Sequence, residues 1–216
     1  MTLRALLALC LIAAISPIAH AAPPLAAADV FELQWAADPQ VSPDGRQVAY
    51  VRQRGDAMKD AYTGDLWLVG TDGRDHRPIV PRAASPRWSP DGTRLLYVAA
   101  GDSGTQLFVR WLDTGATTQV TRVQQKPSHL AWSPDGSMVA FVLPVAEETP
   151  PLAKPLPKPE GAEWAAPPKV IEKLIYRADG EGYLADTRDQ VLVVSALGGT
   201  PRQLTTGSFE HSGPLA

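Results

Sequence analysis

Trp88-Ser89-Pro90-Asp91-Gly92 is the stretch that decides the fold, because its last four residues recur in register along the chain. The tetrads start 47 and 44 residues apart, at 42–45, 89–92 and 133–136, with Trp132 before the third and Val41 before the first. Proline presets φ for the first central position of a turn, and glycine accepts the positive φ that closes it. Each tetrad therefore predicts a tight turn between two strands.

Two further elements recur after every tetrad. An apolar run follows directly, such as 95–98, and a second apolar segment occurs at 65–73, 106–115 and 190–199 before a short Thr/Val/Leu-rich stretch. These segments are rich in β-branched and aromatic residues, as strands are. A repeat of about 44 residues that holds four strands is typical of a propeller blade. We therefore predict an all-β fold, a partial β-propeller of about three four-stranded blades. A β-sandwich has strands at similar spacing but gives no reason for the repeat.

The repeat also sets the predicted domain boundaries. We expect a lead-in helix within 22–35 and a propeller fragment over 36–216, with blades at about 36–81, 82–122 and 123–206 and the start of a fourth at 207–216. A proline-rich insertion, about 144–188, interrupts the third blade. Aligning Leu130-Ala131 with Leu215-Ala216 places the next tryptophan just beyond Ala216. Propellers need roughly four to eight blades, so we expect this chain to be an incomplete fragment of a larger one.

The first 21 residues have the pattern of a cleavable signal peptide. Arg4 is followed by an apolar run to Ala19, and Ala19-His20-Ala21 places small residues at the −3 and −1 positions of a cleavage site. The run is shorter than a membrane span, although an uncleaved anchor remains the alternative. We expect a periplasmic or secreted protein with no membrane attachment after cleavage.

Composition narrows the classes of partner and cofactor. A formal net charge of −3 over 216 residues argues against nucleic acid as a partner. The single cysteine, Cys10, excludes a disulfide framework and a cysteine-based zinc site. The scattered His76, His129 and His211 predict no metal site, and the acidic residues do not fit an EF-hand loop; these are Asp179, Glu181, Asp186 and Asp189. We expect no cofactor.

No residue of this chain is predicted to be catalytic. Gly101-Asp102-Ser103-Gly104 resembles the nucleophile motif of trypsin-type peptidases, but it fits a hairpin turn. The chain contains no Gly-x-Ser-x-Gly nucleophile elbow. Glu147-Glu148 could bind the ammonium end of a peptide, and the alternative is a solvated acidic pair.

Several of these features together resemble one family. The export signal, the lead-in Ala28-Asp-Val-Phe-Glu-Leu33, the Trp-Ser-Pro-Asp-Gly repeats and the segment 168–184 are similar to bacterial exported prolyl oligopeptidase-family serine peptidases, in their acylaminoacyl-peptidase and dipeptidyl-peptidase branch. The resemblance implies a propeller that admits short peptides to a C-terminal α/β-hydrolase domain, which carries the Ser-Asp-His triad. None of the triad positions lies in this chain, so we expect peptide substrates only through that missing domain and no activity of the fragment alone. The tetrads are also shared with TolB-type propellers, and a non-catalytic TolB-like periplasmic propeller that binds other proteins is the alternative.

Overall fold

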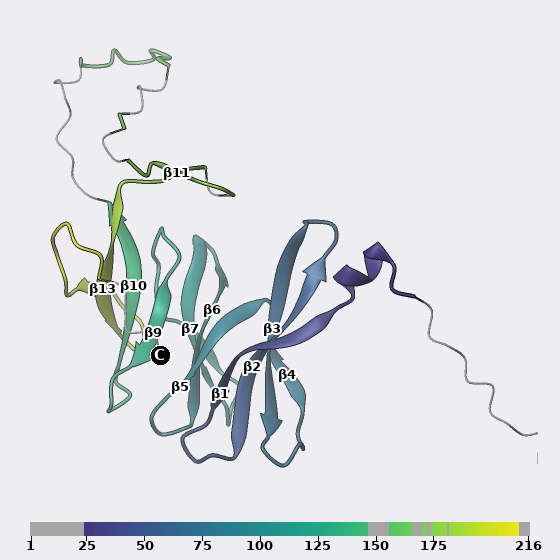
Figure 1. Cartoon of the computed structure of the whole chain (residues 1–216). Helices are drawn as coiled ribbons and strands as arrows, with labels where there is room; N and C mark the ends of the chain where they lie inside the picture. Colours follow the sequence, from purple (N-terminus) through teal and green to yellow (C-terminus); the bar gives the residue numbers. More distant parts are fainter. Residues whose placement is uncertain (1–23, 147–155, 166–169, 172–173, 181, 212–216) are drawn as a thin grey trace, which may run out of the picture.

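The computed structural model describes residues 24–146, 156–165, 170–171, 174–180 and 182–211. Three four-stranded antiparallel sheets follow one another along these residues (Figure 1). The first contains β1 (Gln34–Val41), β2 (Gln47–Asp56), β3 (Ala61–Gly70) and β4 (Arg77–Val80). The second contains β5 (Ala83–Trp88), β6 (Arg94–Gly101), β7 (Gly104–Trp111) and β8 (Thr117–Gln119). The third contains β9 (Ser128–Trp132), β10 (Met138–Ala146), β13 (Thr187–Ser195) and β14 (Arg202–Gln203). The predicted all-β architecture of successive propeller blades is confirmed, and we call these sheets blades 1, 2 and 3.

The hydrophobic core lies between neighbouring blades. Because side chains alternate along a strand, blade 2 has one face toward blade 1 and the other toward blade 3. Between blades 1 and 2 the buried residues are Ala49, Val51, Leu66, Leu68, Ala83, Leu95 and Tyr97. Between blades 2 and 3 they include Leu96, Val98, Leu107, Val109, Leu130, Val139, Phe141, Leu192 and Val194. The two central strands of blade 2, β6 and β7, therefore supply apolar side chains to both interfaces.

The long insertion leaves the end of one hairpin of blade 3 without disturbing its strands. β10 and β13 pair without a break from Met138↔Ser195 to Ala146↔Thr187, although 40 residues separate them in the chain. Within the intervening segment, β11 (Arg177–Ala178) and β12 (Gly182–Tyr183) form a small hairpin. It projects from the end of the blades opposite the tetrad turns (Figure 1). The described part of the insertion thus lies away from the core.

A short 3₁₀ helix, η1 (Ala27–Phe31), precedes the first blade. Its start is held by Asp29, whose carboxylate accepts a hydrogen bond from the backbone N–H of Ala26 at 2.8 Å. The helix packs on β2 at Gly55, where a Cβ atom would lie 2.9 Å from the Cα of Phe31. Glycine at this position therefore permits the close approach of the lead-in to blade 1.

Candidate functional site

The three tetrads fold into the same turn. In each, the serine hydroxyl donates to the aspartate two residues later, at 2.6 Å from Ser42, 2.5 Å from Ser89 and 2.5 Å from Ser133. The same serine oxygen accepts the backbone N–H of the first residue of the next strand at 2.9 Å in all three turns, as Arg94 donates to Ser89. The glycines Gly45, Gly92 and Gly136 have φ of 72°, 69° and 67°. Every residue of the tetrad thus serves the turn that the sequence predicts.

The hydrogen bonds of these turns stabilise ionised aspartates. The Ser89 hydroxyl is the main cause that lowers the pKa of Asp91 to about 2, with the backbone N–H of Thr93 adding to it against some burial. Ser133 and the backbone N–H of Ser137 likewise lower the pKa of Asp135 to about 2. Hydrogen bonds to the charged form of a carboxyl favour that form. These carboxylates are therefore fixed structural acceptors and not proton carriers near neutral pH.

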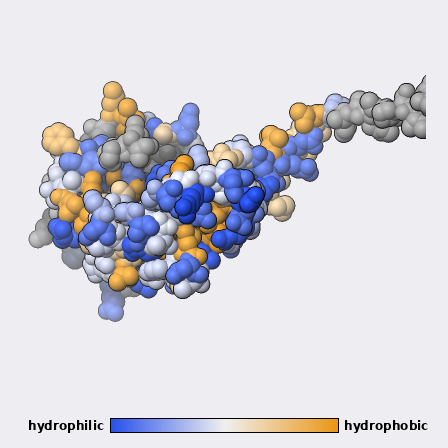
Figure 2. Space-filling view, turned by 90° about the horizontal axis from the view of Figure 1, so that it is seen from below, coloured by the Kyte–Doolittle hydropathy of each residue, from blue (hydrophilic) through white to orange (hydrophobic). Residues whose placement is uncertain are grey.

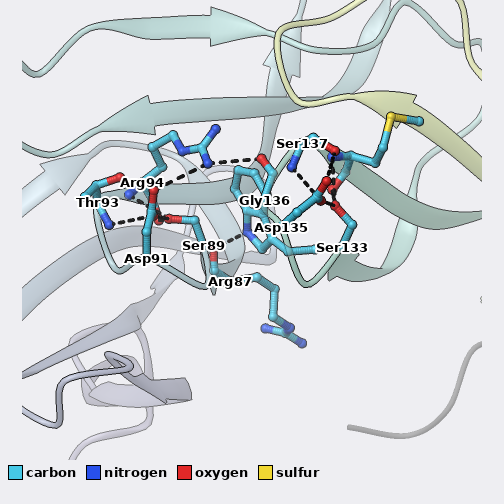
Figure 3. Close-up of polar contacts among 11 residues, drawn as sticks. Arg87, Ser89, Asp91, Thr93, Arg94, Ser133, Asp135, Gly136 and Ser137 are labelled. Atoms are coloured by element: carbon cyan, nitrogen blue, oxygen red, sulfur yellow. Dashed lines mark hydrogen bonds and ion pairs between the residues drawn. The ribbon is translucent and has the colours of Figure 1, made fainter.

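Residues in and next to the tetrads of blades 2 and 3 also form contacts between these two blades (Figure 3). The indole Nε1 of Trp132 donates to the carbonyl oxygen of Arg87 at 3.0 Å. Arg94 reaches from blade 2 to donate to the carbonyl oxygen of Gly136 at 3.0 Å, and its guanidinium lies 4.8 Å from the centre of the Trp132 ring. The tryptophan before the tetrad therefore joins its blade to the preceding one.

The first strands of the three blades share an irregularity at one position. Four residues before each tetrad serine, Asp38, Ser85 and His129 have φ of 47°, 55° and 48°, in the left-handed region that is unusual for residues other than glycine. In all three blades the pairing of the first strand with the second shifts register near this position. These are β-bulges, which bend and twist a strand locally. We call the edge formed by β1, β5 and β9 the inner edge, because these strands of successive blades lie next to one another (Figure 1).

The inner edge carries an ion pair between two blades. Nη1 of Arg87 on β5 lies 3.0 Å and 2.9 Å from the two carboxylate oxygens of Asp38 on β1. It also donates to the carbonyl oxygen of Pro86 at 2.7 Å, while Nε of Arg87 is buried without a hydrogen-bond partner. On β9, Nδ1 of His129 lies 3.1 Å from Oγ of Ser128. Polar side chains thus gather along the edge that a propeller turns toward its axis, and this edge is the candidate functional surface.

The other residues singled out from the sequence are dispersed. Asp102 and Ser103 connect β6 to β7 in a hairpin whose last pair is Gly101↔Gly104, in agreement with the turn interpretation. His76 hydrogen-bonds to Tyr50 on blade 1, and the backbone N–H of His211 donates to Asp189 near blade 3. Among the described residues no three histidine, cysteine or acidic side chains are grouped to hold a metal ion.

The acidic residues of the insertion are only partly described. Asp186 forms an ion pair with Arg188 at 3.7 Å, and the backbone N–H of Asp189 donates to the carboxylate of Glu210 at 2.7 Å. Asp179 lies in a turn before β12. Glu147, Glu148 and Glu181 lie outside the described residues, so the proposed ammonium-binding role of Glu147-Glu148 stays a hypothesis.

A buried polar network of glutamine and threonine side chains, which was not predicted from the sequence, recurs in blades 2 and 3. The fully buried Gln106 accepts at Oε1 from the hydroxyl of Thr121 at 2.9 Å, and Thr121 accepts the backbone N–H of Leu107 at 3.0 Å. Thr205 donates to Gln190 at 2.7 Å in the same way. The signal was present in the sequence, because a glutamine opens the second recurring element in both blades and a threonine follows 15 residues later.

The network fixes the outer part of each blade. Gln106 Nε2 also donates to the carbonyl oxygen of Val123 at 2.7 Å, so the chain leaving blade 2 is held to β7. Beside the equivalent Gln190 of blade 3, a pocket of about 260 Å³ is lined by both apolar and polar residues, the polar ones including Arg188, Gln203 and Ser208. Arg188 donates from Nε to the carbonyl oxygen of Ser208 at 2.9 Å. This hydrogen bond fixes the Arg188 side chain in the pocket wall.

The surface at the end of the blades where the tetrad turns lie carries both hydrophilic and apolar residues. Viewed from this end, hydrophilic residues dominate and apolar residues are scattered between them, while the lead-in extends away from the blades (Figure 2). No helix among the described residues is long and apolar enough to span a membrane.

Comparison with known proteins gives sequence relatives that are peptidases. No family model matches the chain. An uncharacterized peptidase of Bacillus subtilis, YuxL, is 29% identical over 196 residues, which cover 88% of this chain and 29% of that protein. Dipeptidyl-peptidase 5 of Porphyromonas endodontalis is 28% identical over 104 residues, 47% of this chain and 15% of that protein. The resemblance to peptidases is therefore confirmed, and the chain spans less than a third of the length of these relatives.

TolB proteins match a smaller part of the sequence. The Tol-Pal system protein TolB of Hahella chejuensis is 36% identical over 78 residues, which are 35% of this chain and 18% of TolB. Among solved structures, the acylaminoacyl peptidase of Pyrococcus horikoshii aligns with a TM-score of 0.57 at 16% identity over 77% of this chain and 24% of its own. A puromycin-hydrolyzing peptidase of Mycobacterium tuberculosis aligns with a TM-score of 0.51 at 18% identity over 84% of this chain and 25% of its own. At these identities the structural likeness shows the fold alone.

Proposed function

We propose that this chain is the propeller part of an exported serine peptidase, in which it restricts access of peptides to a catalytic domain supplied by the remainder of a longer polypeptide. The observation that carries the proposal is the match to YuxL, because it extends over 88% of this chain but only 29% of the peptidase. We therefore expect the catalytic groups of the whole protein to lie outside these 216 residues. A serine nucleophile is inferred from the family resemblance of the tetrads, lead-in and insertion.

The geometry supports a rigid gate. Blades 1 and 2 are joined at the inner edge by the pair of Arg87 and Asp38, whose side chains are 23% and 31% exposed. Indole hydrogen bonds and apolar cores join all three blades. Such contacts hold the polar inner edge in a fixed shape, and a fixed opening discriminates substrates by size. Short peptides and loose chain ends would pass, and folded proteins would be excluded.

The catalytic part of the proposal is tested with two proteins, the full-length gene product and the 216-residue chain. A fluorophosphonate probe reports an activated serine, and a chromogenic aminoacyl or dipeptidyl substrate reports hydrolysis. We expect the full-length protein to be labelled and to release the chromophore, and the 216-residue chain to do neither. Hydrolysis by the 216-residue chain, or none by the full-length protein on a panel of such substrates, would refute this assignment.

The gating part requires a comparison of substrate sizes. In the full-length protein, Arg87→Met removes the inter-blade ion pair. Arg74→Met is the control, because Arg74 is exposed and pairs with Asp72 of its own turn at 3.7 Å. We expect Arg87→Met to raise the ratio of kcat/KM for a long peptide over a dipeptide, while Arg74→Met leaves the ratio unchanged. An unchanged ratio in both variants contradicts a gating role of the inner edge.

Export is proposed from residues 1–21, which lie outside the described residues. Periplasmic protein recovered from a bacterial host should begin at Ala22, as measured by intact mass. A mass that retains Met1–Ala21 would argue for the uncleaved anchor instead.

The TolB matches favour a second candidate function, a non-catalytic periplasmic propeller that binds other proteins. They cover 35% of this chain and 18% of each TolB protein. A full-length protein that recovers stable envelope partners in a pull-down and resists the fluorophosphonate probe would favour this function over the peptidase.

A further inference from the structure

The residues at the three β-bulges of the inner edge differ in what their side chains do. All three have the left-handed backbone conformation, which costs free energy for any residue with a Cβ atom and which glycine adopts freely. In blade 1 the side chain has a structural use, because the carboxylate of Asp38 pairs with Arg87 of blade 2 and accepts a hydrogen bond from Gln40 at 2.8 Å. Within the described residues, the bulge side chains of blades 2 and 3, Ser85 and His129, make no hydrogen bond or ion pair to another blade.

Both of these side chains are available to a ligand. Among the described residues, the Ser85 hydroxyl makes no hydrogen bond, and it is not one of the buried polar atoms that lack a partner, so it reaches solvent. His129 is exposed, and its Nδ1 lies 3.1 Å from Oγ of Ser128. A hydroxyl that donates to Nδ1 leaves the ring proton on Nε2. Ser85 and His129 thus each offer a hydrogen-bond donor at the inner edge.

The two donors lie at the same level of neighbouring strands. β5 and β9 are adjacent at the inner edge, and each donor residue comes four positions before its tetrad serine. Neither strand contains an aspartate or a glutamate. The carboxylate at the equivalent position of β1, Asp38, is already paired with Arg87. The surroundings of Ser85 and His129 therefore favour a ligand that brings its own negative charge.

We propose that Ser85 and His129 form a site on the inner edge that binds a carboxylate group of a peptide. A carboxylate has two acceptor oxygens, one for each donor, and hydrogen bonds to an ionised acceptor are stronger than those to a neutral one. A ligand contact also gives a reason for side chains at strained positions, since such strain gathers at functional sites. The site rests on the proposed function, because it gives the gate a substrate class, namely peptides with a free C-terminal carboxylate or an acidic side chain.

Peptide binding to the full-length protein tests the site. The protein is first treated with a fluorophosphonate, which blocks a catalytic serine. Fluorescence anisotropy then gives the dissociation constants of three peptides with a neutral dye at the N-terminus: Ala-Ala-Ala-Ala as the free acid, its C-terminal amide, and Ala-Ala-Glu-Ala amide.

We expect the free acid, the glutamate peptide or both to bind about tenfold more tightly than the plain amide, as charge-assisted hydrogen bonds imply. Tight binding of the free acid identifies a C-terminal carboxylate as the ligand, and tight binding of the glutamate peptide identifies an acidic side chain. Equal binding of all three peptides overturns the proposal.

His129→Gly separates a ligand contact from a structural one. Glycine removes the imidazole and relaxes the left-handed backbone, so we expect binding of the carboxylate peptide to weaken about tenfold while the midpoint of thermal unfolding does not fall. Ser85→Gly should act in the same way. Asp38→Gly is the matched variant in blade 1, and it should lower the midpoint because it breaks the pair with Arg87. Unchanged binding in His129→Gly, or a fall in its midpoint as large as that of Asp38→Gly, contradicts the site.

His76→Gln is the control for binding, because His76 precedes β4, the strand of blade 1 farthest from the inner edge. It should leave all three dissociation constants unchanged. None of these measurements requires hydrolysis. A protein that gives the expected binding but resists the fluorophosphonate refutes only the proposed function. A labelled peptidase that binds the acidic and amide peptides equally refutes only the carboxylate site.

Discussion

Trp132 donates its indole N–H to the carbonyl oxygen of Arg87 at 3.0 Å, and Trp88 makes the equivalent bond to Gln40 at 2.9 Å one blade earlier. The tryptophan before each of these tetrads therefore connects a turn to the blade that precedes it. Val41 occupies the same position in blade 1 and is 61% exposed. The departure of the first repeat from the tryptophan pattern thus coincides with the absence of a preceding blade among the described residues.

Trp132→Phe should weaken the contact between blades 2 and 3. It removes the bond to Arg87 and reduces the aromatic surface under Arg94, so we expect a loss of about 1 kcal/mol in the free energy of unfolding, measured by urea denaturation. Trp164→Phe is the control, because Trp164 lies half exposed in the insertion, away from the blade cores. A Trp132→Phe variant as stable as the control would show that the indole bond contributes nothing net.

Thr121→Val should be more damaging than its small change in shape suggests. The substitution leaves the backbone N–H of Leu107 and one acceptor position of Gln106 unpaired in a fully buried site. Each unpaired buried group costs about 1–3 kcal/mol, and we expect a loss in this range in the free energy of unfolding from chemical denaturation. Thr118→Val is the control. Thr118 lies on β8, three residues before Thr121, and is only partly buried, so its substitution should change the free energy of unfolding by much less. Equal effects of the two substitutions would contradict the structural role of the Gln106–Thr121 pair.

Gly136→Ala and Gly45→Ala form a matched pair in equivalent turns. Both glycines have positive φ, which costs about 1 kcal/mol for alanine. A Cβ atom at Gly136 would lie 2.7 Å from Nη2 of Arg94, whereas one at Gly45 would meet nothing within 4 Å. We therefore expect Gly136→Ala to lower the melting temperature further than Gly45→Ala. Arg94→Ala should remove most of that difference, and if the difference persists in its background, displacement of Arg94 is not its cause.

The tetrad aspartates predict loss of stability in acid. The pKa values of Asp91 and Asp135 are lowered from the ordinary 3.8 to about 2 in the folded chain by the serine hydroxyls and nearby backbone N–H groups. Because the unfolded chain binds these protons more readily, the stabilisation is complete above pH 4 and is lost as the pH falls toward 2. We expect the urea midpoint to fall across this range in the wild type and to fall less in the double variant Asp91→Asn, Asp135→Asn.

The matched control for the acid experiment is Asp102→Asn, in the β6–β7 hairpin of blade 2. It should keep the wild-type dependence of the urea midpoint on pH between 4 and 2. If the double aspartate variant has the same dependence as this control, the tetrad carboxylates do not account for the acid sensitivity.

Some features of the site could not be read from the chain. The bulge position holds three different residue types, Asp38, Ser85 and His129, so no repeated residue marked it in the sequence. Asp38 and Arg87 are 49 residues apart and face each other only because β1 and β5 come together at the inner edge.

The amino-acid sequence by itself determined the turns, the strands and their grouping into blades, because proline and glycine backbone preferences and strand alternation act within a few residues. Only the tertiary structure decided which carbonyl receives each indole, which blade Arg94 reaches and that Arg87 faces Asp38. These contacts depend on how whole sheets pack against one another, and that packing is set by apolar side chains distant in the chain.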